Sequence, residues 1–156
     1  MLSYASGISD LPLLGETIGA NLERTVARFG DREALVDVAA GTRWTYAEFD
    51  AAVNRVALGL LARGIAKGDR VGIWAPNCAE WVVTQFATAK AGIILVNVNP
   101  AYRTSELEYA LRQSGCRMLI AAPAIRRGCR AGSAGTGGRA RSPPPRWRPP
   151  RSWAAL

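Results

Sequence analysis

The sequence lacks histidine altogether and has few cysteines. Without an imidazole, these residues cannot form Ser-His-Asp or Cys-His catalytic groups, or a histidine-ligated zinc site. The three cysteines, Cys78, Cys116 and Cys129, contain no CxxC pair. We therefore expect free thiols instead of a disulfide or metal framework. No Gly-x-Gly-x-x-Gly motif follows an expected strand, which excludes the usual dinucleotide-binding signature.

Long hydrophobic runs are also missing. The apolar stretch at residues 91–96 is far shorter than the roughly 20 residues that a membrane-spanning helix needs. The first 15 residues have neither a basic region nor a continuous apolar segment of the kind found in secretory signal peptides. We expect no transmembrane segment and a cytoplasmic protein.

Charge is distributed unevenly along the chain. Residues 1–122 carry 12 basic and 12 acidic side chains, whereas residues 123–156 carry eight arginines and no acid, which accounts for the net charge of +8. Arg, Pro, Ala and Gly make up 25 of those last 34 residues. Such a composition buries too little apolar surface to offset the entropy of ordering. We predict a folded part at 1–122 and a disordered tail at 123–156.

Two interpretations of this tail remain open. Arginines interleaved with Trp147 and Trp153 are typical of segments that bind nucleic acid or anionic membranes. The interpretation we favour is a reading-frame shift in GC-rich DNA, because the composition changes abruptly near Pro123 and GC-rich codons encode these four residue types. Residues 132–139 are glycine-rich like a phosphate-binding loop, but they contain no lysine and lie within the tail rich in proline and arginine, so we expect a compositional accident.

Hydrophobic periodicity predicts an α/β fold: a partial, layered parallel sheet with flanking helices, preceded by a two-stranded hairpin. The last three strands alternate with helices, which favours parallel pairing and right-handed connections. The expected strands are residues 33–38, 43–46, 70–75, 93–98 and 117–121. The expected helix caps are Thr17, Thr45, Asn77, and Thr104 or Ser105, and the helices end at Gly30, Gly64, Gly92 and Gly115.

The expected core follows from the same periodicity. The continuous apolar run at 93–98 is typical of a strand covered on both faces. We expect the sheet to be unfinished, with two open edges. The side chains expected to point inward are Phe49, Val53, Val56, Leu60 and Leu61 on the second helix, and Leu107, Ala110 and Leu111 on the fourth. The third helix is expected to continue through Trp81, Val82, Gln85, Phe86 and Ala89 to Gly92.

Two stretches resemble the first third of the adenylating domain of fatty-acyl-CoA synthetases, which belong to the adenylate-forming, AMP-binding superfamily. They are residues 42–50 (TRWTYAEFD) and residues 68–122. Residues 44–49 match the family's LTYxEL-like opening. Residues 89–100 (AKAGIILVNVNP) match its KAGxxxxPxxP-like block, with Asn97 in place of the first proline.

The resemblance implies a two-step ligase of lipid metabolism that uses ATP, Mg²⁺ and CoA. A fatty-acid carboxylate attacks ATP to give an acyl-adenylate, and the CoA thiol then displaces AMP. The family's TSGTTGxPKG phosphate loop, its YGxTE and TGD blocks and its C-terminal lysine do not occur here. We therefore expect a truncated synthetase that is inactive alone, and we assign no catalytic residue and no metal ligand. The alternative is a non-enzymatic α/β module whose basic tail binds nucleic acid or anionic membrane.

One loop is a candidate binding site. Asn99, Pro100, Ala101 and Tyr102 follow a strand expected to be parallel, and α/β ligand sites gather at the carboxyl ends of such strands. The resemblance implies that this loop lies near the CoA-binding side of the complete enzyme. The competing interpretation is a strand-to-helix turn made rigid by proline.

Other residues have structural interpretations that we favour. Lys90 could meet an anion, but a solvated lysine at a helix end is the simpler reading. Trp44, Trp74 and Trp81 have core-like spacing, which favours packing over a role in an acyl tunnel. Glu48 and Glu80 are each three residues after an expected cap, where they complete capping boxes.

Overall fold

The computed structural model describes residues 14–122. The predictions about the first residues, Cys129, the glycine-rich stretch at 132–139 and the disordered tail lie outside this part of the chain. Four helices and five strands make up the described part: α1 (Ile18–Phe29), β1 (Glu33–Asp37), β2 (Thr42–Thr45), α2 (Tyr46–Ala62), β3 (Arg70–Trp74), α3 (Ala79–Ala91), β4 (Ile94–Asn97), α4 (Thr104–Ser114) and β5 (Met118–Ala121).

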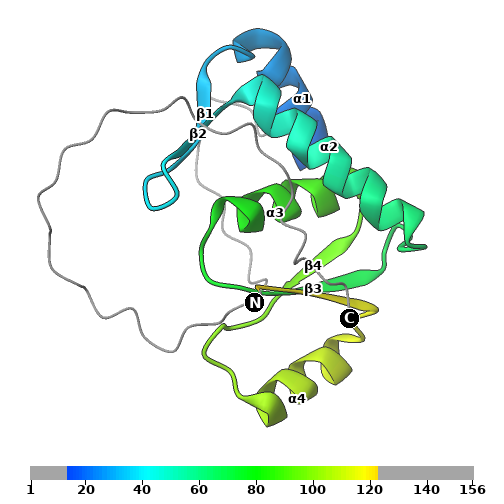
Figure 1. Ribbon diagram of the computed structural model, residues 1–156. Coiled ribbons are helices and arrows are strands. Elements are labelled where there is room, and N and C mark those ends of the chain that lie inside the picture. The colour runs from blue at the N-terminus through cyan, green and yellow to red at the C-terminus, as the bar shows by residue number, and fades with distance from the viewer. Residues whose placement is uncertain (1–13, 123–156) are drawn as a thin grey trace, which may run out of the picture.

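The strands form two sheets. β1 and β2 pair antiparallel as a hairpin, and β3 lies between β4 and β5 in a parallel sheet of order β4-β3-β5. Helices α1, α2 and α3 lie on one side of this sheet and α4 lies alone on the other (Figure 1). The predicted α/β class, the hairpin, the parallel pairing and the two open edges are confirmed.

Local sequence explains where the first two helices begin. Thr17 Oγ1 accepts a hydrogen bond of 3.1 Å from the Ala20 amide at the start of α1. At the start of α2, Thr45 Oγ1 accepts from the Glu48 amide at 3.2 Å, and Glu48 Oε2 accepts from the Thr45 amide at 2.9 Å. These contacts satisfy amides that have no partner within the helix, so both predicted caps are confirmed.

The caps predicted for the last two helices are wrong. Helix α3 begins after Cys78, not after Asn77, and its cap makes no side-chain hydrogen bond. That shift moves Glu80 one position out of register for a capping box. Helix α4 begins after Arg103, whose amide donates to Glu106 Oε2 at 2.8 Å. An acidic side chain three residues along satisfies the first amide here without a hydroxyl cap.

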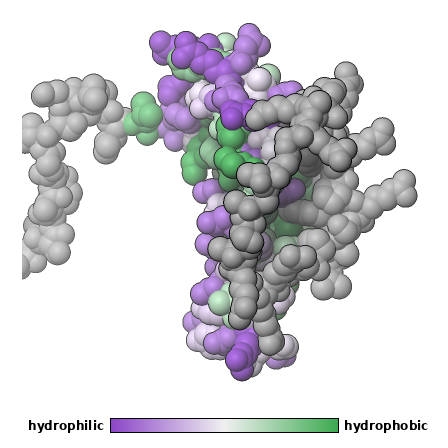
Figure 2. Space-filling view, turned by 60° about the vertical axis from the view of Figure 1, so that its left-hand side comes forward, coloured by the Kyte–Doolittle hydropathy of each residue, from purple (hydrophilic) through white to green (hydrophobic). Residues whose placement is uncertain are grey.

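The core lies between the three helices and the sheet. Val53, Val71 and Ile73 are fully buried, and the Phe49 and Phe86 rings meet edge to face with centroids 5.3 Å apart. On the face seen in Figure 2, hydrophobic side chains also reach the surface between hydrophilic ones. The predicted inward face of α2 is confirmed except at Leu61, which is 46% exposed because α2 ends there and projects beyond the sheet.

Helix α3 buries mainly small residues. The buried residues are Ala79, Val83, Thr84, Ala87 and Thr88, whereas Gln85 is exposed. Val82 and Phe86 pack against the core but are only partly buried. Helix α3 contacts both the sheet and the two outer helices, so the small residues at the closest contacts are the ones fully covered.

The expectation that residues 93–98 form a strand covered on both faces is also wrong. β4 is an edge strand, and within it Ile94 is 52% exposed and Asn97 is exposed. On the far side of the sheet, α4 buries Leu107, Ala110 and Leu111 only in part. The face of the sheet that α4 covers is therefore less completely buried than the face covered by α1, α2 and α3.

Candidate functional site

The loop after β4 is a hydrogen-bonded turn at the carboxyl edge of the parallel sheet. Asn99 Oδ1 accepts from the Ala101 amide at 2.9 Å, and the Asn99 carbonyl accepts from the Tyr102 amide at 3.0 Å. The same carbonyl accepts from Trp74 Nε1 at 3.2 Å, which ties the loop to the end of β3. Asn99 therefore fixes the position of Tyr102.

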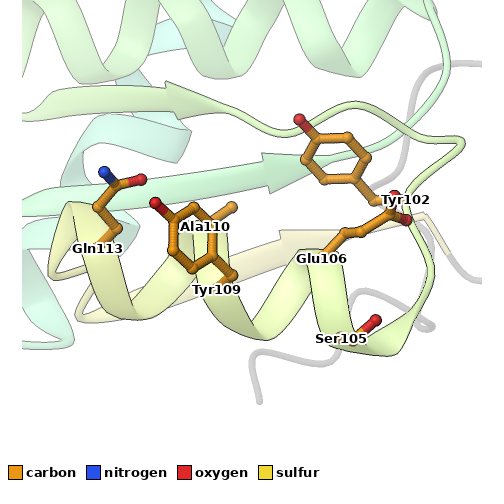
Figure 3. A pocket seen from close by; sticks show the side chains of 6 residues that line it. All are labelled: Tyr102, Ser105, Glu106, Tyr109, Ala110 and Gln113. Carbon is orange, nitrogen blue, oxygen red and sulfur yellow. The ribbon is translucent and has the colours of Figure 1, made fainter.

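A shallow hollow of about 380 Å³ opens beside this turn. Figure 3 shows Tyr102 at one end and side chains from one face of α4 along it. Its lining residues are Tyr102, Ser105, Glu106, Tyr109, Ala110 and Gln113. Of the four predicted loop residues, Tyr102 lines the hollow and Asn99 supports it, while Pro100 and Ala101 are exposed and do not line it.

Sequence reasoning missed the helical part of this hollow. Ser105, Tyr109 and Gln113 follow Tyr102 at intervals of three or four residues, which places them on one helical face. That spacing was readable in the sequence, but it marks only a polar outer face. The hollow becomes visible once the turn brings Tyr102 back over α4.

The lining groups limit what the hollow can hold. They comprise two phenol rings, a hydroxyl, an amide and one carboxylate, and no cation. Glu106 Oε2 is already engaged by the Arg103 amide at 2.8 Å. Such a surface suits a flat group that stacks on phenol rings and accepts or donates hydrogen bonds. It does not suit a triphosphate, which needs cations or converging amides.

Lys90 is neither solvated nor open to an anion, so both readings of it are wrong. Its Nζ lies 2.7 Å from Asp50 Oδ1, 2.9 Å from Asn54 Oδ1 and 3.1 Å from Glu23 Oε1, and its side chain is only 10% exposed. Burial by itself would lower the pKa of Lys90, but the hydrogen bonds to Asp50 and Glu23 outweigh it and raise that pKa. Lys90 thus joins α1, α2 and α3.

The remaining candidates have structural roles. Trp44 is buried in the core, as its spacing predicted, and Trp74 and Trp81 are partly buried. Cys78 and Cys116 are free thiols, also as predicted. Burial raises the pKa of the Cys78 thiol, and the nearby Glu80 carboxylate adds to the effect. A thiol held protonated in this way is a poor nucleophile.

The described residues do not fit the other groups that the resemblance implies. Between residues 14 and 122, no three His, Cys, Asp or Glu side chains come together as a metal site would require. The two strand-to-helix connections of the parallel sheet, at 75–78 and 98–103, contain no glycine and no lysine to surround a triphosphate. In the same part of the chain, every helix is too short or too polar to cross a membrane.

Comparison with known proteins identifies the family. The sequence profile described as "AMP-binding enzyme" matches residues 22–142, most of the chain. The chain belongs to the AMP-binding enzyme family. It is 53% identical over 118 residues to the zebrafish (Danio rerio) medium-chain acyl-CoA ligase ACSF2, mitochondrial, covering 76% of this chain and 20% of that protein. The human enzyme of the same name is 49% identical over 119 residues, covering 76% and 19%.

Solved structures share the fold of this chain. The N-terminal domain of FACL13 from Mycobacterium tuberculosis superposes with a TM-score of 0.66 at 34% identity, over 68% of this chain and 27% of that one. The N-terminal subdomain of NpsA from Klebsiella oxytoca, in complex with anthranilyl-AMSN, gives a TM-score of 0.62 at 27% identity, over 67% and 27%. The predicted resemblance and fold class are confirmed.

These comparisons also correct one prediction. The zebrafish and human relatives are named as mitochondrial enzymes, which contradicts the expected cytoplasmic location. The expectation rested on the absence of a secretory signal, and mitochondrial import uses a different, amphipathic and arginine-rich address. The alternative of a non-enzymatic module with a basic tail finds no support here. The chain spans about a fifth of the length of the curated relatives it matches.

Proposed function

We propose that this chain is the opening scaffold of the adenylating domain of an acyl-CoA ligase, and that it does not activate a fatty acid by itself. Two observations together support this proposal. The fold is that of the family, but the strand-to-helix connections of the parallel sheet contain no groups that could bind a triphosphate. Residues 14–122 supply three parallel strands and their helices, but neither a glycine-rich loop nor a lysine at the carboxyl edge of the sheet.

The whole enzyme would join a medium-chain fatty acid to CoA. In the first step, a carboxylate oxygen attacks the α-phosphorus of ATP, and the bond to the β-phosphate breaks to release pyrophosphate. In the second step, the CoA thiolate attacks the acyl carbonyl and AMP leaves. The zebrafish and human relatives are medium-chain acyl-CoA ligases by name, which supports this substrate class. When bound, Mg²⁺ would neutralise phosphate charge, and residues outside 14–122 would have to hold it.

Within that enzyme, we place the loop of Asn99, Pro100, Ala101 and Tyr102 on the CoA side. The support is its position at the carboxyl edge of the sheet, together with the hollow of phenol and amide groups that Tyr102 closes. A nucleoside base is flat and hydrogen-bonding, as that hollow requires. When the chain is titrated with CoA and followed by NMR, the resonances of Tyr102 and Tyr109 should shift. A Tyr102→Ala variant should lose these shifts, whereas shifts confined to other residues would refute the placement.

The inactivity has a direct test. ATP–pyrophosphate exchange should be measured on the purified 156-residue chain with medium-chain fatty acids and Mg²⁺, alongside the full-length zebrafish enzyme as positive control. We expect exchange for the control and none above background for the chain. Fatty-acid-dependent exchange by the chain would refute the proposal.

A further inference from the structure

The amino-terminal edge of the parallel sheet carries an excess of positive charge. Four cations, Arg63, Lys67, Arg70 and Arg117, occupy the connections that enter β3 and β5 or the first residue of β3. Asp69 is the one acidic residue in the connections 63–69, 92–93 and 115–117. We call these four cations the basic edge; it lies at the right of Figure 1, where α2 ends and β3 begins.

Hydrogen bonds and an ion pair bring part of the basic edge together. Arg117 Nη1 donates to Asp69 Oδ2 at 2.6 Å and to the Gly64 carbonyl at 3.5 Å, next to Arg63. Arg70 Nε donates to the Ser114 carbonyl at 3.0 Å, and the Arg117 amide donates to the Arg70 carbonyl at 2.8 Å. Residues from the connections 63–69 and 115–117 therefore lie together with the start of β3 and the end of α4.

Two of the four cations have a structural role. Helices α2 and α4 end at this edge, and cations near helix C-termini balance the partial negative charge of free carbonyls. Arg70 and Arg117 serve this purpose. Arg63 makes one long contact of 3.3 Å to the Gly59 carbonyl, and Lys67 has no ion-pair partner among residues 14–122. Both side chains are exposed, and Asp69 is already paired with Arg117.

Exposed apolar side chains occur on the elements that end or begin at this edge. Leu58 and Leu61, on the last turns of α2, are 66% and 46% exposed, and Ile94 at the start of β4 is 52% exposed. The Ile94 amide donates to the Asp69 carbonyl at 2.8 Å, and the Gly68 amide donates to the Gly92 carbonyl at 2.9 Å, which places β4's start beside Lys67. Exposed leucine and isoleucine framed by unpaired cations form the pattern of surfaces that sit on a bilayer.

We propose that the basic edge, with Leu58, Leu61 and Ile94, docks on an anionic lipid bilayer. The cations meet lipid phosphates while the three apolar side chains enter the headgroup region. The proposal stands independently of the proposed function, because it concerns only side chains on the described surface.

Flotation with lipid vesicles tests the proposal on the full chain. Vesicles of phosphatidylcholine alone are compared with vesicles containing about a third phosphatidylglycerol. The double variant Arg63→Gln/Lys67→Gln should lower the partition coefficient on anionic vesicles roughly 20- to 30-fold, since each cation near a membrane contributes about fivefold. Leu61→Ser should also lower binding, and its remaining binding should keep the salt dependence of the unaltered chain.

The matched control removes equal charge elsewhere. Arg28→Gln/Arg32→Gln lies at the α1–β1 turn, where both cations sit over the Phe29 ring. We expect its binding to stay within about twofold of the unaltered chain. Equal losses in the two double variants, or unchanged binding in Arg63→Gln/Lys67→Gln, would overturn the proposal. So would loss of all binding on deleting residues 123–156, because the tail would then carry the interaction.

A second measurement needs no substitution. Hydrogen exchange of the unaltered chain should slow at residues 61–70 and 92–94 when anionic vesicles are added, and should not change in the β1–β2 hairpin. Protection confined to other residues would overturn the proposal even if the variants fail to fold.

Discussion

Lys90 holds three helices together. Replacing it with methionine keeps most of the volume but leaves Asp50, which is 18% exposed, facing Asn54 without its cation. Hydrogen bonds to charged groups contribute about 1.5–3 kcal/mol, so we expect Lys90→Met to lower the free energy of unfolding by about that amount. Urea unfolding measures it. The control Lys67→Met removes an exposed, unpaired lysine and should change stability by less than about 0.5 kcal/mol; equal losses would contradict the account.

Asp69 should make stability depend on pH in acid. A hydrogen bond from the Ala66 amide and the Arg117 guanidinium hold the pKa of Asp69 below its ordinary value of 3.8. A carboxyl whose folded pKa is lowered stabilises the protein at higher pH, and the contribution is lost as the pH falls from about 4 through the folded pKa. Thermal unfolding between pH 2.5 and 6 should therefore fall less steeply in Asp69→Asn than in the unaltered chain. Parallel curves would refute this assignment.

The environment of single residues was the least predictable feature. Lys90 looked like a solvated helix-end residue because its partners lie 36 and 40 positions earlier in the chain. No local pattern reports such a contact. Trp44, by contrast, was predictable because its burial follows from its position in a hairpin next to an amphipathic helix.

At the scale of elements, the starts of α2 and α3 allow a helix with a side-chain cap to be compared with one that has none. Thr45 caps α2 through its hydroxyl, whereas Cys78 occupies the same position of α3 in an extended conformation without a side-chain bond. Losing a hydroxyl cap costs about 1 kcal/mol, so Thr45→Ala should destabilise by that amount and Cys78→Ser should stabilise by a similar one. The midpoints of urea unfolding measure both effects. If Cys78→Ser lowers the stability, burial of the thiol outweighs the gain from a hydroxyl cap.

The type and order of the elements could be predicted from sequence, but not every buried face. Helix α2 repeats its large apolar residues every three to four positions, and its inward face was assigned correctly up to Leu61. Helix α3 carries apolar or small residues on all sides, so periodicity could not choose between its faces. The hollow beside α4 was missed for a related reason: it depends on how the turn at Asn99 folds back.

At the scale of the molecule, the open sheet edges should promote self-association. β4 and β5 flank β3, and neither carries a charged residue within its bounds. Uncharged edge strands readily pair with other chains. Sedimentation velocity should show association that grows with protein concentration. Asn97→Lys places a charge at an exposed position of the β4 edge and should reduce it; association unaffected by this change would assign it to another surface.

The order β4-β3-β5 explains why β4 was misjudged. Its sequence is continuous and apolar like a central strand, yet in the described part of the chain it has a neighbour on one side only. An apolar run shows that a strand has hydrophobic side chains, but it does not show how many neighbours the strand has. The pattern and the observed exposure therefore differ.

The central claim is that residues 14–122 form the scaffold of an AMP-binding enzyme without its nucleotide site. The most direct test is an NMR titration of the isotope-labelled 156-residue chain with ATP and Mg²⁺. The account predicts no saturable shift at the carboxyl ends of β3, β4 and β5 up to millimolar ATP. Saturable shifts there, with a dissociation constant in the micromolar range, would contradict it.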